Sequence, residues 1–272
     1  MTDTSFCWGP LLEGGPLFLG ILNLTPDSFS DGGRYMATEA ALAQARALVA
    51  AGARMLDLGA ESTRPGADTV SEAEEWQRLA PVLAALREVL PGVPISLDTR
   101  HAEVARQGLA AGVAVLNDVT GFSDPAMLAL AQTSDCGLIA MRSRIDDGHL
   151  VMPPYDAPAL RRADEILGEL RVVRDRLCLA GVADRRIVLD PGFGFGTTYQ
   201  EDLSLWRALP ELSGALGWPA DRFCIGISRK RFLAARNDTP DLPPDQRDDL
   251  TAVAHAEASA LGFRIFRTHA IR

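Results

Sequence analysis

Short apolar runs alternate with longer amphipathic stretches along most of the chain. The run LFLGILNL is continuous and apolar, which is typical of a strand buried on both faces. The longer stretches carry apolar residues at helical spacing, and several end at a glycine. The apolar runs predict eight strands, over residues 17–24, 54–59, 94–99, 114–119, 137–143, 186–192, 223–228 and 264–269.

The stretches between these runs predict the helices. They cover residues 37–52, 71–90, 101–112, 125–134, 158–180, 202–213 and 248–262. Strict alternation of strand and helix implies parallel strands joined by crossover helices. Eight such units in roughly 250 residues match the size of an α/β protein of the (β/α)8 TIM-barrel type. An open doubly wound sheet is the alternative.

The organisation of the chain is simple. We expect a single domain over residues 1–272, because no linker-like or low-complexity segment interrupts the pattern. The last predicted strand ends near His269 and the sequence stops at Arg272. We therefore expect the eighth barrel helix, which would follow that strand, to be absent from this chain.

Composition narrows the range of partners. The formal net charge is −9, which argues against general nucleic-acid binding and means that an anionic ligand must meet a local basic cluster. No apolar run approaches the ~20 residues that span a membrane, and the first residues lack a signal-peptide pattern. The four cysteines are far apart, so we expect reduced thiols in a cytoplasmic protein.

Polar residues recur where the predicted strands end. The C-terminal ends of parallel barrel strands converge on one rim, which is where such barrels carry their chemistry. Each residue alone could be a helix cap or a turn residue. Their recurrence in nearly every unit favours a common site. They are Asn23, Asp57, Asp98, Asn117, Met141 with Arg142, Asp190, Ser228 to Lys230, and Arg267 with His269.

These residue types suit a flat heterocycle with an anionic tail. Asp98, Asn117 and Asp190 can accept hydrogen bonds from amino and ring N–H groups, and Lys230 can donate to a carbonyl or ring nitrogen. A second group suits phosphate or carboxylate oxygens. It comprises Arg64, Arg267, His269, Ser62 and Thr63. The neutral oxygen of Asn23 suits a Mg²⁺ ion held mostly by water and phosphate.

Seven motifs resemble those of one known family. ILNLTPDSFSDGG, LGAESTRPGA, ISLDT, LNDVTGF, LDPGFGFG, GISRK and RTH occur in order. Together they resemble dihydropteroate synthases over about residues 17 to 269. The resemblance implies condensation of 6-hydroxymethyl-7,8-dihydropterin diphosphate with 4-aminobenzoate, giving 7,8-dihydropteroate and pyrophosphate for folate biosynthesis.

The resemblance also implies a role for each site residue. Asp98, Asn117, Asp190 and Lys230 would hold the pterin, with Met141 and Phe195 packed near it. Asn23, Arg267 and His269 would handle the diphosphate and Mg²⁺, with Asn23 as the metal ligand. Thr63, Arg64 and Ser228 would meet the aminobenzoate. Asp98, Lys230, Arg267 and His269 would be the catalytic residues, and the late helices would form a homodimer.

The loop GILNLTPDSFSDGGRY would act as a lid that closes over the diphosphate and excludes water. The chain departs from the usual family pattern at several positions. They are Ala60, Ala140, Thr197, Glu201, Asp202 and Ala270. Because the residues expected to bind the pterin are intact, we expect activity.

Three alternatives share parts of this pattern. A pterin-dependent methyltransferase would use the same barrel and pocket, but would not need the SRK motif or the Arg267 and His269 pair. A catalytically idle relative would bind pterin without turnover. An isomerase-type barrel would carry a glycine-rich phosphate site after strands seven and eight, and SRKRF, which follows the seventh strand here, is not glycine-rich.

Overall fold

The computed structural model describes residues 5–24, 34–61, 70–146 and 149–272. Within these ranges the main sheet has eight strands, paired in the order β8-β5-β4-β3-β2-β1-β10-β9, and every pairing is parallel. A further parallel bridge between Leu189 and Phe223 closes the sheet. The (β/α)8 barrel is therefore confirmed, and the open doubly wound sheet is wrong.

The barrel strands lie where the apolar runs predicted them. They are β1 (Leu17–Asn23), β2 (Met55–Gly59), β3 (Ile95–Asp98), β4 (Val115–Asp118), β5 (Gly137–Met141), β8 (Ile187–Asp190), β9 (Cys224–Ile225) and β10 (Ile265–Thr268). A small antiparallel pair, β6 (Ile145–Asp146) and β7 (His149–Leu150), follows β5 and was not predicted. Two-residue strands are too short to leave a periodic signal.

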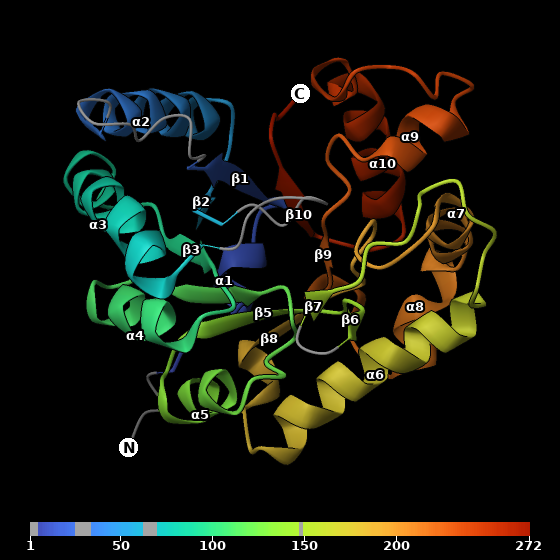
Figure 1. Cartoon of the computed structure of the whole chain (residues 1–272), viewed down its shortest axis with the longest axis horizontal. Coiled ribbons are helices and arrows are strands. Elements are labelled where there is room, and N and C mark those ends of the chain that lie inside the picture. Colours follow the sequence, from blue (N-terminus) through green and yellow to red (C-terminus); the bar gives the residue numbers. More distant parts are fainter. Residues whose placement is uncertain (1–4, 25–33, 62–69, 147–148) are drawn as a thin grey trace.

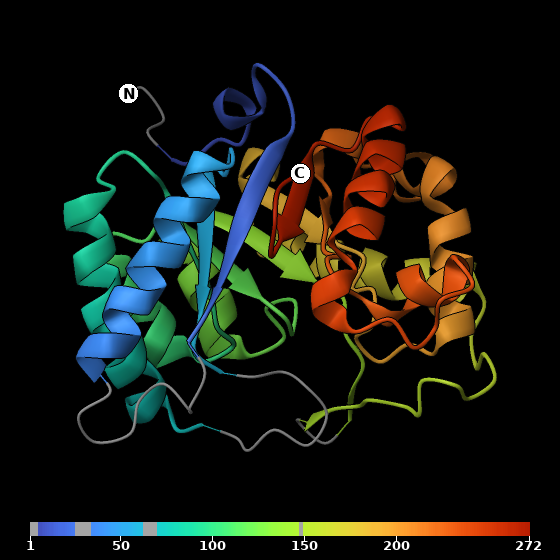
Figure 2. The same cartoon turned by 90° about the horizontal axis from the view of Figure 1, so that it is seen from above.

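Helices surround the strands (Figures 1 and 2). The longer ones are α2 (Arg34–Ala50), α3 (Glu72–Val89), α4 (Ala102–Ala110), α5 (Pro125–Thr133), α6 (Ala163–Leu179), α7 (Tyr199–Arg207), α8 (Leu209–Leu216) and α10 (Asp248–Ala260). The shorter ones are α1 (Gly9–Leu12), α9 (Arg231–Arg236) and the 3₁₀ turns η2 (Asp184–Arg186), η3 (Ala220–Arg222) and η4 (Pro244–Gln246).

The helix boundaries differ from prediction in two places. The stretch predicted as one helix over 202–213 forms α7 and α8, because Pro210 has no N–H to continue the ladder and instead occupies the first turn of a new helix. The helix predicted from 158 begins at Ala163, where the Glu165 carboxylate accepts a hydrogen bond from the Arg162 backbone N–H (2.7 Å). At the start of α3, Ser71 Oγ caps the helix by accepting from the Glu74 N–H (3.3 Å).

The barrel interior changes from apolar to polar along the strands. Alternate residues of a strand point to the same face. At the N-terminal end the interior is filled by one apolar cluster, to which Trp8, the residue before α1, adds its ring. That cluster comprises Trp8, Leu12, Leu17, Leu19, Met55, Val115, Ile139, Val188, Cys224 and Ile265. Two residues further along their strands come Asp57, Asn117, Met141, Asp190 and Arg267, so the interior face becomes polar towards the C-terminal ends.

The four cysteines are unpaired; Cys136 and Cys224 are buried, and Cys7 and Cys178 are partly so. None of the helices that the structure describes is both long and apolar enough to cross a membrane.

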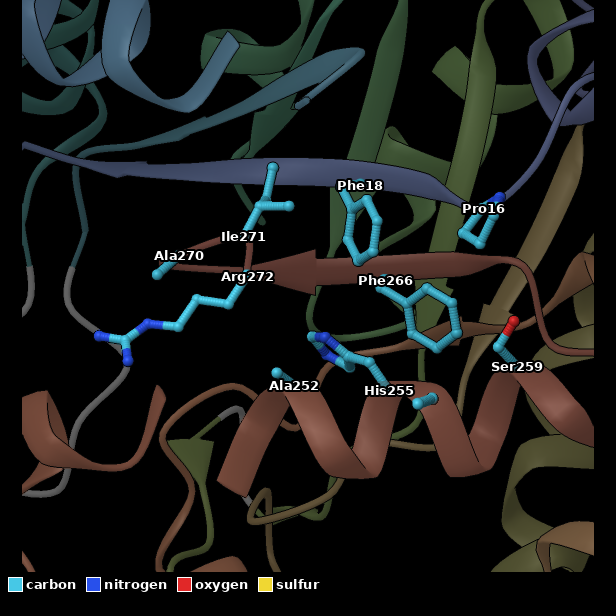
Figure 3. Close-up of a pocket in the computed structure, with 10 residues that line it drawn as sticks. Pro16, Phe18, Ala252, His255, Ser259, Phe266, Ala270, Ile271 and Arg272 are labelled. Carbon is cyan, nitrogen blue, oxygen red and sulfur yellow. The ribbon is translucent and has the colours of Figure 1, made fainter. Parts of the chain in front are cut away.

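A cavity of about 260 Å³ lies outside β1 and β10, beside α10 (Figure 3). The imidazole of His255 lies in its wall, with its ring centroid 4.8 Å from that of Phe266 and 6.0 Å from that of Phe18. Its Nε2 has no hydrogen-bond partner among the described residues. Burial lowers the pKa of His255 to about 4.

This burial predicts a loss of stability in acid. An unfolded histidine titrates near pH 6.5, so between pH 6.5 and 4 the unfolded state binds more protons than the folded state. His255 should therefore cost up to ~3 kcal/mol of unfolding free energy as the pH falls through this range. We expect His255→Phe to remove that loss, measured by urea unfolding of both proteins at pH 7 and pH 4.5. If the two proteins differ in unfolding free energy by the same amount at pH 7 and at pH 4.5, the prediction is contradicted.

Candidate active site

The predicted site residues that the structure describes lie at one end of the barrel. Asp98, Asn117, Asp190 and Arg267 lie at the C-terminal ends of β3, β4, β8 and β10. For Asn117, Asp190 and Arg267, the residue two positions earlier belongs to the apolar cluster of the barrel interior. Asn23 and Met141 end β1 and β5, and Ser228, Lys230 and His269 follow β9 and β10. The expected rim is therefore present. Thr63 and Arg64 lie outside the described residues, as does most of the proposed lid loop.

Arg267 is the centre of a hydrogen-bonded chain across the barrel. Its Nε donates to Asp57 Oδ2 (2.5 Å), and its Nη2 donates to Asp98 Oδ2 (2.6 Å). On the far side of Asp57, Asn117 Nδ2 donates to both carboxylate oxygens (3.3 and 3.2 Å). Burial alone would lower the pKa of Arg267, but the charges of Asp57 and Asp98 outweigh it and raise that pKa above its ordinary value. The Arg267 guanidinium is therefore a permanent cation at the C-terminal end of the barrel strands, which we call the mouth of the barrel.

Asp98 has the properties of a ligand-binding carboxylate. Burial raises its pKa to about 7, although the charge of Arg267 acts in the opposite direction. Its side chain still has 25% exposure at the mouth. On the neighbouring strand, a Cβ at Gly59 would lie only 3.2 Å from the Asp98 Cβ, so glycine there makes room for the acid. A ligand N–H that reaches Asp98 would meet an acceptor in a poorly hydrated environment, where such a bond is strong.

Asp190 and Lys230 form the other half of the site. Burial raises the pKa of Asp190, and Lys230 opposes that shift. Asp190 Oδ1 accepts from the Gly192 N–H (2.7 Å), while its Oδ2 lies where a Cβ at Gly226 would come within 3.0 Å. Glycine at 226 therefore leaves room for the second carboxylate oxygen of Asp190.

Lys230 is the single lysine in a chain with 27 basic residues. Its ammonium donates to the Phe193 carbonyl and lies 4.5 Å from the centroid of the Phe195 ring. Burial lowers its pKa to about 8, while Asp190 and Asp202 limit the shift. All the other Lys or Arg positions are arginine, whose guanidinium stays charged. Position 230 alone carries a lysine ammonium, a compact cation whose charge can change near neutral pH when it is buried.

Ser228 and His269 are adjacent across β9 and β10. Ser228 Oγ lies 3.0 Å from His269 Nδ1 and accepts from the His269 backbone N–H (3.1 Å). The Thr268 hydroxyl donates to the Ala270 carbonyl (2.7 Å), and its oxygen lies 3.3 Å from Ser228 Oγ. This local network holds the His269 imidazole beside Ser228 at the end of β10.

Asn23 is the candidate metal ligand. It ends β1 with its side chain exposed, in register with Gly59 of β2. Within the ranges that the structure describes, no three His, Cys, Asp or Glu residues form a metal-binding group. One neutral oxygen at an open mouth fits Mg²⁺, which keeps several waters and relies on substrate phosphates rather than on a protein cage.

The loop after β8 is held by side chains that follow it in the chain. Asp202 Oδ1 accepts from the Gly194 N–H (2.9 Å) and from the Thr197 hydroxyl (2.7 Å). Glu201 is fully buried, accepts from the Thr198 N–H (2.9 Å) and pairs with Arg161 (3.1 Å). Thr197, Glu201 and Asp202 thus form a consistent set of contacts that shape the loop carrying Phe195.

Two buried residues are part of the site although they were not proposed as functional residues. Asp57 is fully buried at the centre of the hydrogen-bonded chain. Arg142, with 1% exposure, donates to the carbonyls of Pro191 (3.0 Å) and Gly192 (2.8 Å) and so holds the loop after β8. A signal for Asp57 existed, since a carboxylate within an apolar strand needs a partner. Arg142 also stood among the polar residues at the strand ends, but nothing in the sequence indicated its partners, which are two backbone carbonyls and Glu169.

The fold and the rim define a barrel enzyme that binds a polar heterocycle. The family model described as "Pterin binding enzyme" matches residues 19–269, and the chain belongs to that family. A dihydropteroate synthase of Synechocystis sp. is 40% identical, with 98% of this chain and 88% of that protein covered.

Solved structures support the same assignment. Dihydropteroate synthase of Xanthomonas albilineans with 4-aminobenzoic acid has a TM-score of 0.80 and 35% identity, with 95% of this chain and 88% of that chain covered. Dihydropteroate synthase of Anaplasma phagocytophilum with bound 6-hydroxymethylpterin-monophosphate has a TM-score of 0.82 and 33% identity, with 94% of each chain covered.

Proposed function

We propose that the chain is a dihydropteroate synthase, a transferase of folate biosynthesis. It would join 6-hydroxymethyl-7,8-dihydropterin diphosphate to 4-aminobenzoate and release pyrophosphate. One observation carries the proposal: Asp98, Asn117 and Asp190 end barrel strands and Lys230 follows β9, so these four polar residues share one end of the barrel. The similar structures with 4-aminobenzoic acid and a pterin monophosphate support both substrates.

The pterin ring would lie on this polar layer. Asp98 and Asp190 are acceptors for the amino and ring N–H groups, and the Asn117 amide adds a neutral acceptor. Lys230 donates to the ring carbonyl or a ring nitrogen. Met141 ends β5 in register with Asp190, and the Phe195 ring lies against the Lys230 ammonium. These two side chains would pack near the ring.

The diphosphate would lie above the ring, where His269 faces the mouth beside Ser228. Two of the five N–H donors of Arg267 are engaged by carboxylates, which leaves others for phosphate oxygens. Asn23 would hold Mg²⁺, which would neutralise charge on the departing diphosphate. Ser228, Thr63 and Arg64 are proposed to meet the aminobenzoate carboxylate.

The chemistry needs no nucleophilic side chain. The aromatic amine of 4-aminobenzoate attacks the pterin methylene, the carbon–oxygen bond to the diphosphate breaks, and the amine loses a proton. The protein must stabilise positive charge at the methylene and negative charge on the leaving group. Buried carboxylates beside the ring would stabilise the positive charge at the methylene. Arg267 and His269 would stabilise the negative charge on the departing diphosphate.

Pyrophosphate release is the direct test. The protein is mixed with pterin diphosphate, Mg²⁺ and 4-aminobenzoate, and release is followed with and without each component. Release that depends on 4-aminobenzoate supports the synthase. Pterin binding without release would identify an idle relative, and methyl transfer to a corrinoid without pyrophosphate release would identify a methyltransferase. Chelation of Mg²⁺ should lower the rate if Asn23 holds the ion.

The two perturbed groups predict the pH dependence. Asp98, with a pKa of about 7, must be ionised to accept, and Lys230, with a pKa of about 8, must be protonated to donate. We expect kcat/KM for the pterin substrate to peak between pH 7 and 8, falling on the acid side as Asp98 protonates and on the alkaline side as Lys230 loses its proton. Reductive ¹³C-methylation labels only one lysine, so NMR can follow Lys230 directly. A rate that stays flat from pH 6 to 9 would contradict this assignment.

A homodimer and a cytoplasmic location belong to the same proposal. Both follow from the resemblance and from the composition of the chain, and sedimentation at micromolar concentration tests the first.

A further inference from the structure

Asp57 is fully buried below the mouth, and it hydrogen-bonds to two residues at the mouth, Asn117 and Arg267. It is fully buried on β2, and its partners come from β10 on one side and β4 on the other. An ionised carboxylate can only accept hydrogen bonds. Both groups facing Asp57 must therefore present donors, and this condition orients them.

The orientation of the Asn117 amide follows from that condition. Its Nδ2 lies 3.3 and 3.2 Å from the two oxygens of Asp57. The amide oxygen, on the other branch of the side chain, is directed away from Asp57 and is the group that Asn117 can offer a ligand. Without a carboxylate at 57, the amide could rotate and offer its NH₂ group instead, which would reverse the hydrogen bond seen by the ligand.

The position of Arg267 follows from the same residue. Its Nη2 donates to Asp98, the carboxylate that a ligand also needs, while its Nε donates to Asp57. When a ligand N–H also binds Asp98, Asp98 is shared between the ligand and Arg267. Asp57 then remains as the buried counter-charge of the Arg267 guanidinium. A buried cation without such a partner would be strongly destabilised and would compete with the ligand for Asp98.

We propose that Asp57 is a positioning residue, which sets the amide orientation of Asn117 and keeps Arg267 beside Asp98 while Asp98 binds the ligand. This role rests on the proposed function, because it assumes that Asp98 and Asn117 bind the pterin ring. Asp57 itself acts through its neighbours and touches no reacting atom.

A swap of the two side chains tests the proposal. In Asp57→Asn the new amide faces donors on both sides, so we expect at least about a 10-fold weaker affinity for 6-hydroxymethylpterin. Asn117→Asp places two carboxylates side by side and should weaken binding similarly. The double variant D57N/N117D restores the contact between positions 57 and 117 but not the counter-charge beside Arg267. It should therefore bind more tightly than the product of the two single losses predicts, which is a coupling that independent sites would not show.

Affinity is measured by calorimetry, and KM and kcat by pyrophosphate release. We expect the D57N variant to raise KM for the pterin substrate more than it lowers kcat. Asp118→Asn is the matched control, because Asp118 is equally buried on β4 but accepts only from the Thr120 and Phe122 turn. That control should lose stability and keep its pterin affinity.

Native affinity in the D57N variant, or equal losses in the D57N and Asp118→Asn variants, would overturn the proposal. So would a double variant in which the two losses simply multiply. If the D57N variant does not fold, the comparison of N117D with D57N/N117D still decides the question. The binding arms need no turnover, so native protein that binds pterin but releases no pyrophosphate would refute the proposed function while leaving the Asp57 test in place.

Discussion

Asp98→Asn is expected to weaken pterin binding by about 100-fold or more and to abolish measurable turnover. The substitution keeps the shape of the side chain but replaces an acceptor by a group that presents NH₂ on one branch. Arg267 donates to Asp98 Oδ2 from one side, and a ligand N–H would approach from the other. Either Arg267 or the ligand N–H would then face the new amide NH₂ group, which is also a donor, in a poorly hydrated environment.

The measurement is calorimetry with 6-hydroxymethylpterin, followed by pyrophosphate release across pH. Asp118→Asn again serves as the matched control, since it changes a buried carboxylate on the next strand without touching the mouth. The acid limb of the pH profile, which belongs to Asp98, should disappear in whatever activity remains. Full affinity in a folded Asp98→Asn protein would refute the role given to this residue.

Lys230→Met should lower kcat/KM for the pterin substrate by about 100-fold. Methionine keeps most of the apolar stem but removes the only buried ammonium beside Asp190. Without that cation the pKa of Asp190 should rise further, because Lys230 is what now limits the effect of burial. The variant thus loses the Lys230 ammonium as a donor to the pterin ring. Its Asp190 carboxylate is also protonated in a larger fraction of the molecules and accepts less well.

The alkaline limb of the pH profile distinguishes this effect from general damage to the fold. It should vanish in Lys230→Met, because no other group in the site is assigned to it. Arg231→Met is the control: it removes a more exposed cation one residue further on, which pairs with Asp156 at 3.5 Å and lies over Tyr155. Equal losses in the two variants would contradict a specific role for Lys230.

The alternation of apolar runs and helical stretches was sufficient to predict the barrel, because each parallel strand is buried on both faces and needs a crossover helix to reach the next. It predicted all eight strands and most helices to within a few residues. It failed where the signal was short or ambiguous, as in α9 and the β6–β7 pair, and where Pro210 divides one amphipathic stretch into two helices.

The candidate site could be predicted for the same topological reason. The C-terminal ends of parallel strands in a closed barrel share one rim, so Asp98, Asn117, Asp190 and Lys230 could be grouped before their contacts were known. Their individual roles remain predictions that the experiments above test. Of the residues that the motifs mark only as departures, Thr197 and Asp202 hydrogen-bond to each other, and Glu201 accepts from Thr198 and pairs with Arg161.

The sequence by itself determined the order of the elements, the closed parallel barrel and the set of polar residues at its mouth. These depend on periodicity and on residue type, which are local properties. Only the tertiary structure decided that Arg267 pairs with Asp57 and Asp98 and that Asp57 orients Asn117. These contacts join residues 60 to 210 positions apart. They form only when the strands close into a cylinder and bring buried donors and acceptors into hydrogen-bonding distance, a condition that no local pattern encodes.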